Sequence, residues 1–188
     1  MKRLLVIAIL VLPFVSFAQW QADMVNRINS DSEKSYHVHS DLQQYRYDFT
    51  DEGMQGAVIV IPDENTSAIL MLNEKKVHYT PSNGFISVTN DPVQAYYSYK
   101  EQGTEKTEGT ETVAGYNCVR KSIYDKQGTL MFTMWFSEEL NFPLKMKGHW
   151  DDNTYMYLEN IRQWQPDRSI FKVPSGFVEV DKNLEPVK

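Results

Sequence analysis

Residues 55–72 read QGAVIVIPDENTSAILML, and this stretch decides the fold class. Two apolar runs, 55–61 and 66–72, flank residues 62–65, whose types (Pro-Asp-Glu-Asn) favour a turn. So short a connection cannot carry a crossover, so the two runs are expected to pair as antiparallel strands. The first run is apolar at successive positions, which predicts a strand that is buried on both faces.

The same pattern of short strands and turns continues on both sides of this hairpin. Before it, residues 36–49 alternate apolar and polar, with a change of phase between Leu42 and Tyr45 that predicts a bulge or bend. After it, strands are expected at 75–80, 85–89, 116–124, 129–137, 144–150, 154–164 and 177–180. The Gly-, Thr- and Glu-rich residues 101–111 fit either an acidic linker or an exposed edge strand.

Two segments are interpreted as short helices. Trp20, Met24 and Ile28 recur every four residues, which predicts a helix over 20–29 that packs on the sheet. Pro92 suits a first helical position, so a helix over 93–100 is preferred to a strand there. About nine to eleven antiparallel strands in one domain must curl into a barrel, half-barrel or sandwich to bury one face.

Composition bounds the class of protein. The 188 residues include 24 aromatic side chains and carry a formal charge of −6, which fits one folded domain with a substantial core. Cys118 has no second cysteine in the chain, which excludes an internal disulfide framework and a thiolate zinc cluster. The acidic balance argues against a nucleic-acid-binding protein.

Residues 1–18, MKRLLVIAILVLPFVSFA, have the features of a secretory signal. A basic start precedes an apolar run that is too short to span a bilayer comfortably, and small residues precede an expected cleavage after Ala18. An uncleaved membrane anchor is the alternative. Cleavage leaves 17 basic against 25 acidic residues, a charge of −8, in a periplasmic or secreted protein without a transmembrane anchor.

The sequence contains no pattern that predicts catalysis. It has no nucleophile elbow, P-loop or dinucleotide fingerprint. His37 and His39 alternate on one strand and could reach a common metal, but the spacing of a metal motif is missing, and no metal site is predicted. The paired carboxylates at 51–52, 138–139 and 151–152 fall in turns, where they are expected to be solvated. We therefore expect neither an enzyme nor a cofactor.

Two segments carry a resemblance to a known family. Residues 110–124 (TETVAGYNCVRKSIY), a following Trp-bearing strand and residues 170–177 (IFKVPSGF) resemble a family of uncharacterised exported bacterial proteins. That family is similar to the LolA/LolB-like superfamily of lipoprotein carriers and outer-membrane receptors. The matching positions are Gly109, Thr112, Val113, Ala114, Gly115, Tyr116, Cys118, Trp135, Phe171, Val173, Pro174, Gly176 and Phe177.

The resemblance covers residues 36–181 and implies a strongly curved antiparallel sheet, an unclosed half-barrel with helices across its concave side. Carrier members hold acyl chains in that concavity. The matching residues are turn and packing residues, so they imply the fold and not a chemistry. With the signal, they lead us to expect one LolA-like β domain over 19–181, followed by a frayed tail over 182–188.

These observations suggest two functions. The first is a non-enzymatic envelope protein that binds an apolar ligand, such as a lipid or acyl chain, in the concave face. Methionine and aromatic residues on strands can line an adaptable pocket, although composition alone favours an ordinary core. The candidate lining residues are Met131, Trp135, Met146, Trp150 and Met156. The second function is a structural or protein-interaction module of the envelope, with a filled core and no ligand.

Overall fold

A computed structural model of the chain describes residues 19–27, 33–51, 53–82, 92–165 and 167–187. Within these ranges the chain forms a twelve-stranded sheet, one α-helix and two short 3-10 helices. The first six strands are β1 (Trp20–Arg27), β2 (Lys34–Ser40), β3 (Tyr45–Asp51), β4 (Met54–Ile61), β5 (Thr66–Met71) and β6 (Lys76–Pro81). The others are β7 (Thr104–Val113), β8 (Tyr116–Tyr124), β9 (Leu130–Ser137), β10 (Phe142–Gly148), β11 (Tyr155–Gln163) and β12 (Val178–Glu179). The helices are α2 (Pro92–Gln102), η1 (Pro62–Glu64) and η2 (Arg168–Phe171).

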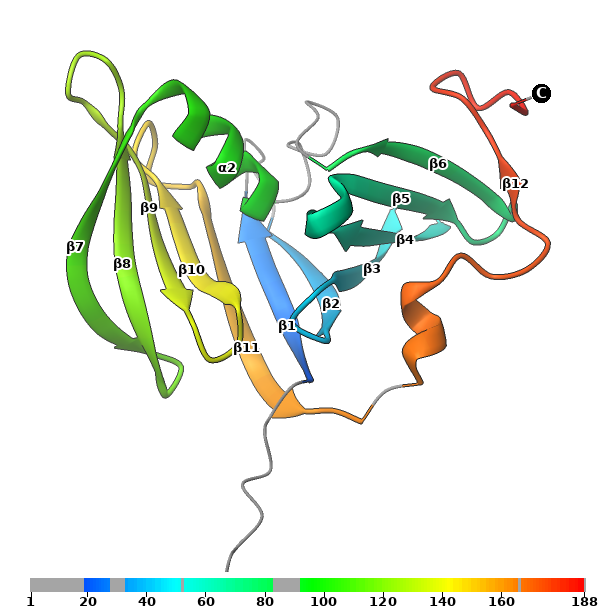
Figure 1. Ribbon diagram of the computed structural model, residues 1–188, viewed down its shortest axis with the longest axis horizontal. Coiled ribbons are helices and arrows are strands. Elements are labelled where there is room, and N and C mark those ends of the chain that lie inside the picture. Colours follow the sequence, from blue (N-terminus) through cyan, green and yellow to red (C-terminus); the bar gives the residue numbers. More distant parts are fainter. Residues whose placement is uncertain (1–18, 28–32, 52, 83–91, 166, 188) are drawn as a thin grey trace, which may run out of the picture.

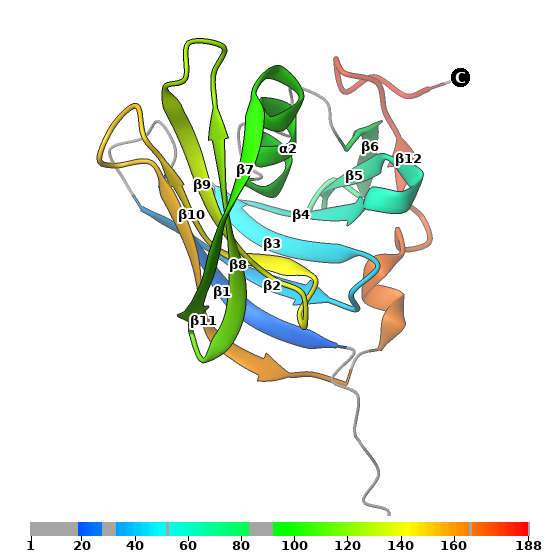
Figure 2. The ribbon, with the colours of Figure 1, turned by 60° about the vertical axis from the view of Figure 1, so that its left-hand side comes forward.

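The order of the strands places β1 inside the sheet, between its two halves. Strands β2 to β6 follow on one side, with β12 at that edge, and β11 to β7 follow in descending order on the other side. All neighbouring strands pair antiparallel except β12 and β6, which are parallel. The sheet is bent, and α2 lies across its concave side (Figure 1, Figure 2). This confirms the prediction of a mainly β fold with a curved antiparallel sheet.

The prediction of a helix at residues 20–29 is wrong, because residues 20–27 form strand β1. A spacing of four residues puts Trp20 and Met24 on one side of a helix, but it also puts them on one face of a strand. Ala22 between them is equally buried, so the buried face follows a period of two. Strand β1 hydrogen-bonds to β2 on one side and to β11 on the other.

Of the two alternatives for the change of phase between Leu42 and Tyr45, a bend is the one observed, and it connects two strands. Residues 41–44 connect β2 to β3, and Leu42 adopts the left-handed conformation at φ 72°. The backbone N–H groups of Gln43 and Gln44 donate to Asp41 Oδ1 at 3.2 and 3.1 Å, which holds the turn. Each strand therefore keeps its own alternation.

The remaining expectations divide into three groups. Of the two alternatives for residues 101–111, an edge strand is the one observed, since residues 104–111 belong to β7 at the end of the sheet. The helix preferred over 93–100 is confirmed as α2, with bounds Pro92–Gln102. The strand expected at 85–89 and the signal at 1–18 lie outside the described residues.

Apolar side chains are buried on both faces of the sheet. On the concave face, Trp20 contacts Phe142 edge-to-face with ring centroids 5.1 Å apart, and Tyr45 contacts the same ring at 5.2 Å. On the outer face of β4 to β6, Ile59 and Leu70 pack with Phe171 of η2 in a second cluster. Strand β4 is thus buried on both faces, as its unbroken apolar run predicts.

The C-terminal residues fold onto the edge of the sheet at β6. Val180 N–H donates to Val77 O at 2.9 Å, and His78 Nδ1 lies 3.0 Å from Val180 O. Val187 N–H donates to Glu179 O at 3.0 Å, so residues 182–187, where a frayed tail is expected, return along β12. The C-terminal segment therefore covers an edge that would otherwise expose backbone groups.

Replacing Trp20 with Phe is expected to lower the free energy of unfolding by about 2–4 kcal/mol, because it opens a cavity and leaves a buried carbonyl without its donor. Trp20 is 2% exposed, and its Nε1 donates to Leu140 O at 3.0 Å. Urea unfolding measures the change. Trp150, at 40% exposed, is the matched control, and Trp150→Phe is expected to cost much less. Equal losses in the two variants would contradict this account of β1.

Candidate functional site

A cavity of about 280 Å³ opens between the start of α2 and one end of the sheet, and we call it the α2 pocket. Its wall comes from the β2–β3 turn, η1 and the end of β6, the first turns of α2, and the β9–β10 turn. The lining residues are Ser40, Leu42, Gln43, Gln44, Tyr45, Pro62, Asn65, Ser82, Val93, Gln94, Tyr97, Phe136, Asn141, Phe142 and Pro143.

Side-chain amides tie together the turns that form this wall. Leu42, Asn65 and Asn141 all adopt the left-handed backbone conformation, which lets the chain reverse sharply. Asn141 Nδ2 donates to Leu42 O at 2.7 Å and so joins the β9–β10 turn to the β2–β3 turn. Ser82 Oγ donates to Asn65 Oδ1 at 3.0 Å and so joins the residues that follow β6 and η1. These bonds fix the shape of the rim.

Helix α2 is held over the concave face by polar contacts at both of its ends. Near its start, Gln94 Nε2 donates to the Tyr45 hydroxyl at 3.2 Å. Further along, the Tyr96 hydroxyl donates to Glu105 Oε2 at 2.7 Å, and Lys100 Nζ lies 3.2 Å from the same carboxylate oxygen. Burial raises the pKa of Tyr96, so its hydroxyl remains a donor at neutral pH. The α2 pocket therefore has one wall anchored to edge strand β7.

The chemistry of the α2 pocket is that of a binding site for an uncharged group. None of its described lining residues is charged, and its interior combines the rings of Phe136 and Phe142 with Val93 and the prolines. The amides of Gln94 and its neighbours offer donors and acceptors at a few points, as in many small-molecule sites. No histidine, carboxylate or cysteine lies in the described lining.

The five residues predicted to line a ligand site are not brought together at one place. Met146 and Met156 are directly opposite each other on β10 and β11 and are almost fully buried. Met131 lines a second cavity, of about 220 Å³, at the far end of α2. Trp150 stacks on Tyr99 of α2 at 5.8 Å between centroids, close to that end of the helix.

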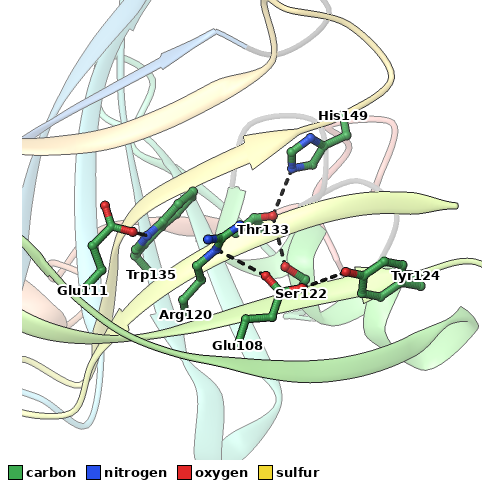
Figure 3. Close-up of polar contacts among 8 residues, drawn as sticks. All are labelled: Glu108, Glu111, Arg120, Ser122, Tyr124, Thr133, Trp135 and His149. Carbon is green, nitrogen blue, oxygen red and sulfur yellow. Dashed lines mark hydrogen bonds and ion pairs between the residues drawn. The ribbon is translucent and has the colours of Figure 1, made fainter.

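Trp135 points away from α2, onto the outer face of the sheet. Phe132, three positions earlier on β9, contacts Tyr99 of α2, and side chains of odd separation lie on opposite faces of a strand. Trp135 Nε1 donates to Glu111 Oε2 at 2.7 Å (Figure 3). Lys145 Nζ lies 4.6 Å from the centroid of the Trp135 ring. None of the five predicted residues lines the α2 pocket, and a ligand role for them stays a prediction.

Sequence periodicity could not have found the α2 pocket, because turn residues build much of its wall. The only local signals are residue types that tolerate the left-handed conformation, such as Asn65 and Asn141, and these are common in any turn. Leu42 gives no such signal. The pocket exists because strand pairing brings three turns and the start of a helix together.

A chain of hydroxyl groups crosses the outer face of β8 and β9 (Figure 3). Ser122 Oγ lies 3.2 Å from Thr133 Oγ1, which lies 2.9 Å from His149 Nε2. Ser122 and Thr133 are almost fully buried, so neither hydroxyl can reach a substrate. Beside them, Glu108 accepts a hydrogen bond from the Tyr124 hydroxyl at 2.7 Å. We interpret this chain as a structural link between neighbouring strands.

His37 and His39 do project from one face of β2, with ring centroids 4.6 Å apart. His37 Nδ1 lies 3.0 Å from Asp23 Oδ1, and His39 packs against the ring of Trp164 at 4.4 Å. Across the ranges that the structure describes, no group of three His, Cys, Asp or Glu side chains could hold a metal ion. Burial, together with the charge of His37, lowers the pKa of His39 to about 4.

The half-buried imidazole of His39 makes the free energy of unfolding depend on pH. The folded-state pKa of about 4 is below the ordinary value of 6.5, so the unfolded chain binds the proton more readily. The contribution of neutral His39 to the free energy of unfolding is therefore complete above pH 6.5. As the pH falls toward 4, this contribution is lost, and the free energy of unfolding decreases by about 1–3 kcal/mol. Urea unfolding across this range is expected to show a smaller pH-dependent loss for His39→Gln than for the unmodified chain. His78→Gln is the control, and identical pH profiles for all three proteins would contradict the prediction.

Solved structures of other proteins resemble this chain in fold, two of them with TM-scores above 0.5. An uncharacterised conserved protein from Thermus thermophilus is 12% identical and has a TM-score of 0.55, with 89% of this chain and 92% of that chain covered. PNGF-II is 11% identical with a TM-score of 0.51, and the matched region covers 87% of this chain and 31% of PNGF-II. A LolA superfamily protein from Nitrosomonas europaea is 8% identical with a TM-score of 0.40, covering 82% and 89% of the two chains.

Comparison of sequences identifies the family. No curated protein matches the chain. The family described as a domain of unknown function, DUF4412, matches residues 23–141, which is more than half of the sequence. The match begins within β1 and ends in the β9–β10 turn, so it includes α2 and most of the segments that form the α2 pocket. The chain therefore belongs to the DUF4412 family.

Proposed function

We propose that this protein is a non-enzymatic binding protein of the bacterial envelope, and that its α2 pocket holds part of an uncharged apolar ligand such as a lipid or acyl chain. The observation that carries the proposal is the cavity of about 280 Å³ whose described lining contains no charged side chain. A charged group would lose its hydration there without gaining a partner, whereas an apolar group would lose nothing.

The size of the α2 pocket limits the ligand. Small-molecule sites usually enclose about 300–1,000 Å³, so this pocket, at about 280 Å³, is just below that range. A short chain, or one end of a longer chain, fits such a space, and the rest of the ligand would extend past the exposed ring of Tyr97. The second cavity, of about 220 Å³ beside Met131, lies at the other end of α2 and offers space for a second segment.

The proposed location rests on the sequence. Residues 1–18 have the pattern of a cleaved secretory signal, which directs the protein to the periplasm or outside the cell. Among the described residues, no helix is both long and apolar enough to cross a membrane. The lone Cys118, which is buried, suits a compartment where exposed thiols are oxidised.

A structural or protein-interaction module of the envelope is the alternative, and the filled concave face favours it. Tyr96 of α2 is fully buried, and Tyr36, Tyr47 and Phe142 occupy the space between the helix and the sheet. A protein whose concavity is filled in this way needs no ligand for stability, and its partner would be another envelope protein.

Lipid extraction and native mass spectrometry of the purified protein distinguish the two functions. A co-purifying lipid, with a mass difference between the native and denatured species that equals one bound molecule, supports the ligand-binding function. Absence of any bound species, together with no binding of a fluorescent fatty ester, would leave the interaction module as the function.

Gln94→Glu is expected to weaken binding of a fluorescent fatty acid methyl ester by about tenfold or more, because it buries a carboxylate in the uncharged α2 pocket. Gln94 is 5% exposed in the pocket wall. Gln55→Glu makes the same change at an exposed site on β4 and is expected to bind like the unmodified protein. Fluorescence titration gives the affinities, and near-UV circular dichroism checks that both variants are folded. Equal affinities in the two folded variants would contradict a ligand in the α2 pocket.

A further inference from the structure

A row of basic and aromatic side chains crosses four strands on the outer face of the sheet. Strand register places Arg120 opposite Trp135, Trp135 opposite Lys145, and Lys145 opposite Tyr157. Partners in register project from the same face, so all four side chains lie on the side away from α2. The Lys145 ammonium lies 4.6 Å from the Trp135 ring centroid, and the Arg120 guanidinium carbon lies 5.7 Å from it.

Beside this row, a shallow groove of about 280 Å³ runs between β10 and β11. Lys147 is opposite Tyr155 in the same register, and the two tyrosine rings stack with centroids 6.2 Å apart. The described lining of the groove is Lys145, Met146, Lys147, Tyr155, Met156 and Tyr157. The groove thus presents tyrosine rings and lysine stems as its walls, with two ammonium groups at its rim.

Three carboxylates lie beside the row and form hydrogen bonds there, and a fourth acidic residue, Glu159, shares the outer face of β11 with Tyr157. Glu111 accepts from the Trp135 indole, Glu108 accepts from Tyr124 and pairs with Arg120 at 3.3 Å, and Glu33 accepts from the Tyr155 hydroxyl at 2.8 Å. In the described part of the chain, neither Lys145 nor Lys147 forms an ion pair. Two neighbouring ammonium groups therefore face solvent in a chain whose formal charge is −6.

We propose that the face formed by Lys145, Lys147, Tyr155 and Tyr157, beside the buried Trp135, is a docking surface for an anionic lipid bilayer. The row spans four neighbouring strands of one sheet face, which suits an extended surface better than a single small ligand. Aromatic rings with a polar tip are favoured at the level of lipid headgroups, and lysines extend from an apolar base toward phosphates. The proposal is independent of a ligand in the α2 pocket, because that pocket is on the other side of the sheet.

Electrostatics explains why such a surface is needed. A protein with a net negative charge is repelled from an anionic membrane unless a basic face is turned toward it. Each lysine close to an anionic surface contributes about 1 kcal/mol of attraction, which is about thirtyfold in affinity for a pair. Docking by this face would leave the concave side and the α2 pocket open to solvent.

Co-sedimentation with vesicles of phosphatidylglycerol or of phosphatidylcholine tests the proposal. The purified protein is expected to bind phosphatidylglycerol vesicles at low salt, to release them at high salt, and not to bind phosphatidylcholine vesicles. The double variant Lys145→Glu/Lys147→Glu is expected to bind phosphatidylglycerol vesicles at least thirtyfold more weakly. The milder Lys145→Gln/Lys147→Gln variant is expected to fall between the two.

The control is Lys172→Glu/Lys182→Glu, which changes the net charge equally at two exposed positions outside the row. It is expected to keep most of the binding. Near-UV circular dichroism and fatty-ester titration verify that each variant is folded and that the α2 pocket is unaffected. Failure to sediment with phosphatidylglycerol vesicles, equal binding to the two lipids, or equal losses in the two Glu double variants would each overturn the proposal. Binding to an acidic polypeptide, without co-sedimentation with vesicles, would overturn the proposal and identify an acidic protein as the partner.

Discussion

The pairing of β1 with β11 is the interaction on which the rest of the structure depends. The strands that precede α2 form one meander and the strands that follow it form another, and β1 joins the two because it pairs with both β2 and β11. Trp20, at the start of β1, adds a hydrogen bond to the β9–β10 turn and a ring contact with Phe142. The long-range pairing turns two local hairpin stacks into one curved sheet, and its cost in loop closure is offset by the core that the curvature encloses.

Curvature places the start of α2 beside three turns and so creates the α2 pocket. The helix is anchored by Tyr96 to Glu105 of β7 and by Gln94 to Tyr45 of β3, elements that lie far apart in the order of the sheet. The helix therefore bridges the two halves of the sheet that β1 joins (Figure 1). The concave side carries an uncharged pocket and the outer side carries a face of lysine and tyrosine side chains, so the two sides of the sheet differ in chemistry.

Local sequence patterns predict most of the strands. The errors arise where contacts between segments that are distant in the sequence decide the structure. Strand β8 has the predicted bounds, because its residues alternate and a Gly115 turn precedes it. The prediction of a helix at Trp20 is wrong because spacing by four residues fits both periods, and only its pairing with β2 and β11 decides between them. An apolar side chain on a strand can pack in a core or line a pocket, and the sequence does not distinguish the two. Met146 and Met156 are predicted to line a pocket, but they lie in the core. The α2 pocket depends on contacts between turns, such as Asn141 with Leu42, that no local pattern encodes.

Methyl-detected NMR during titration with a short-chain monoacylglycerol tests most directly where an apolar ligand binds. Leu42 and Val93 line the α2 pocket, whereas Met146 and Met156 lie in the core under β10 and β11. The account predicts saturable chemical-shift changes that are largest at the methyl groups of Leu42 and Val93 and small at the two methionines. Changes that are largest at Met146 and Met156, or no saturable change at any methyl group, would contradict it.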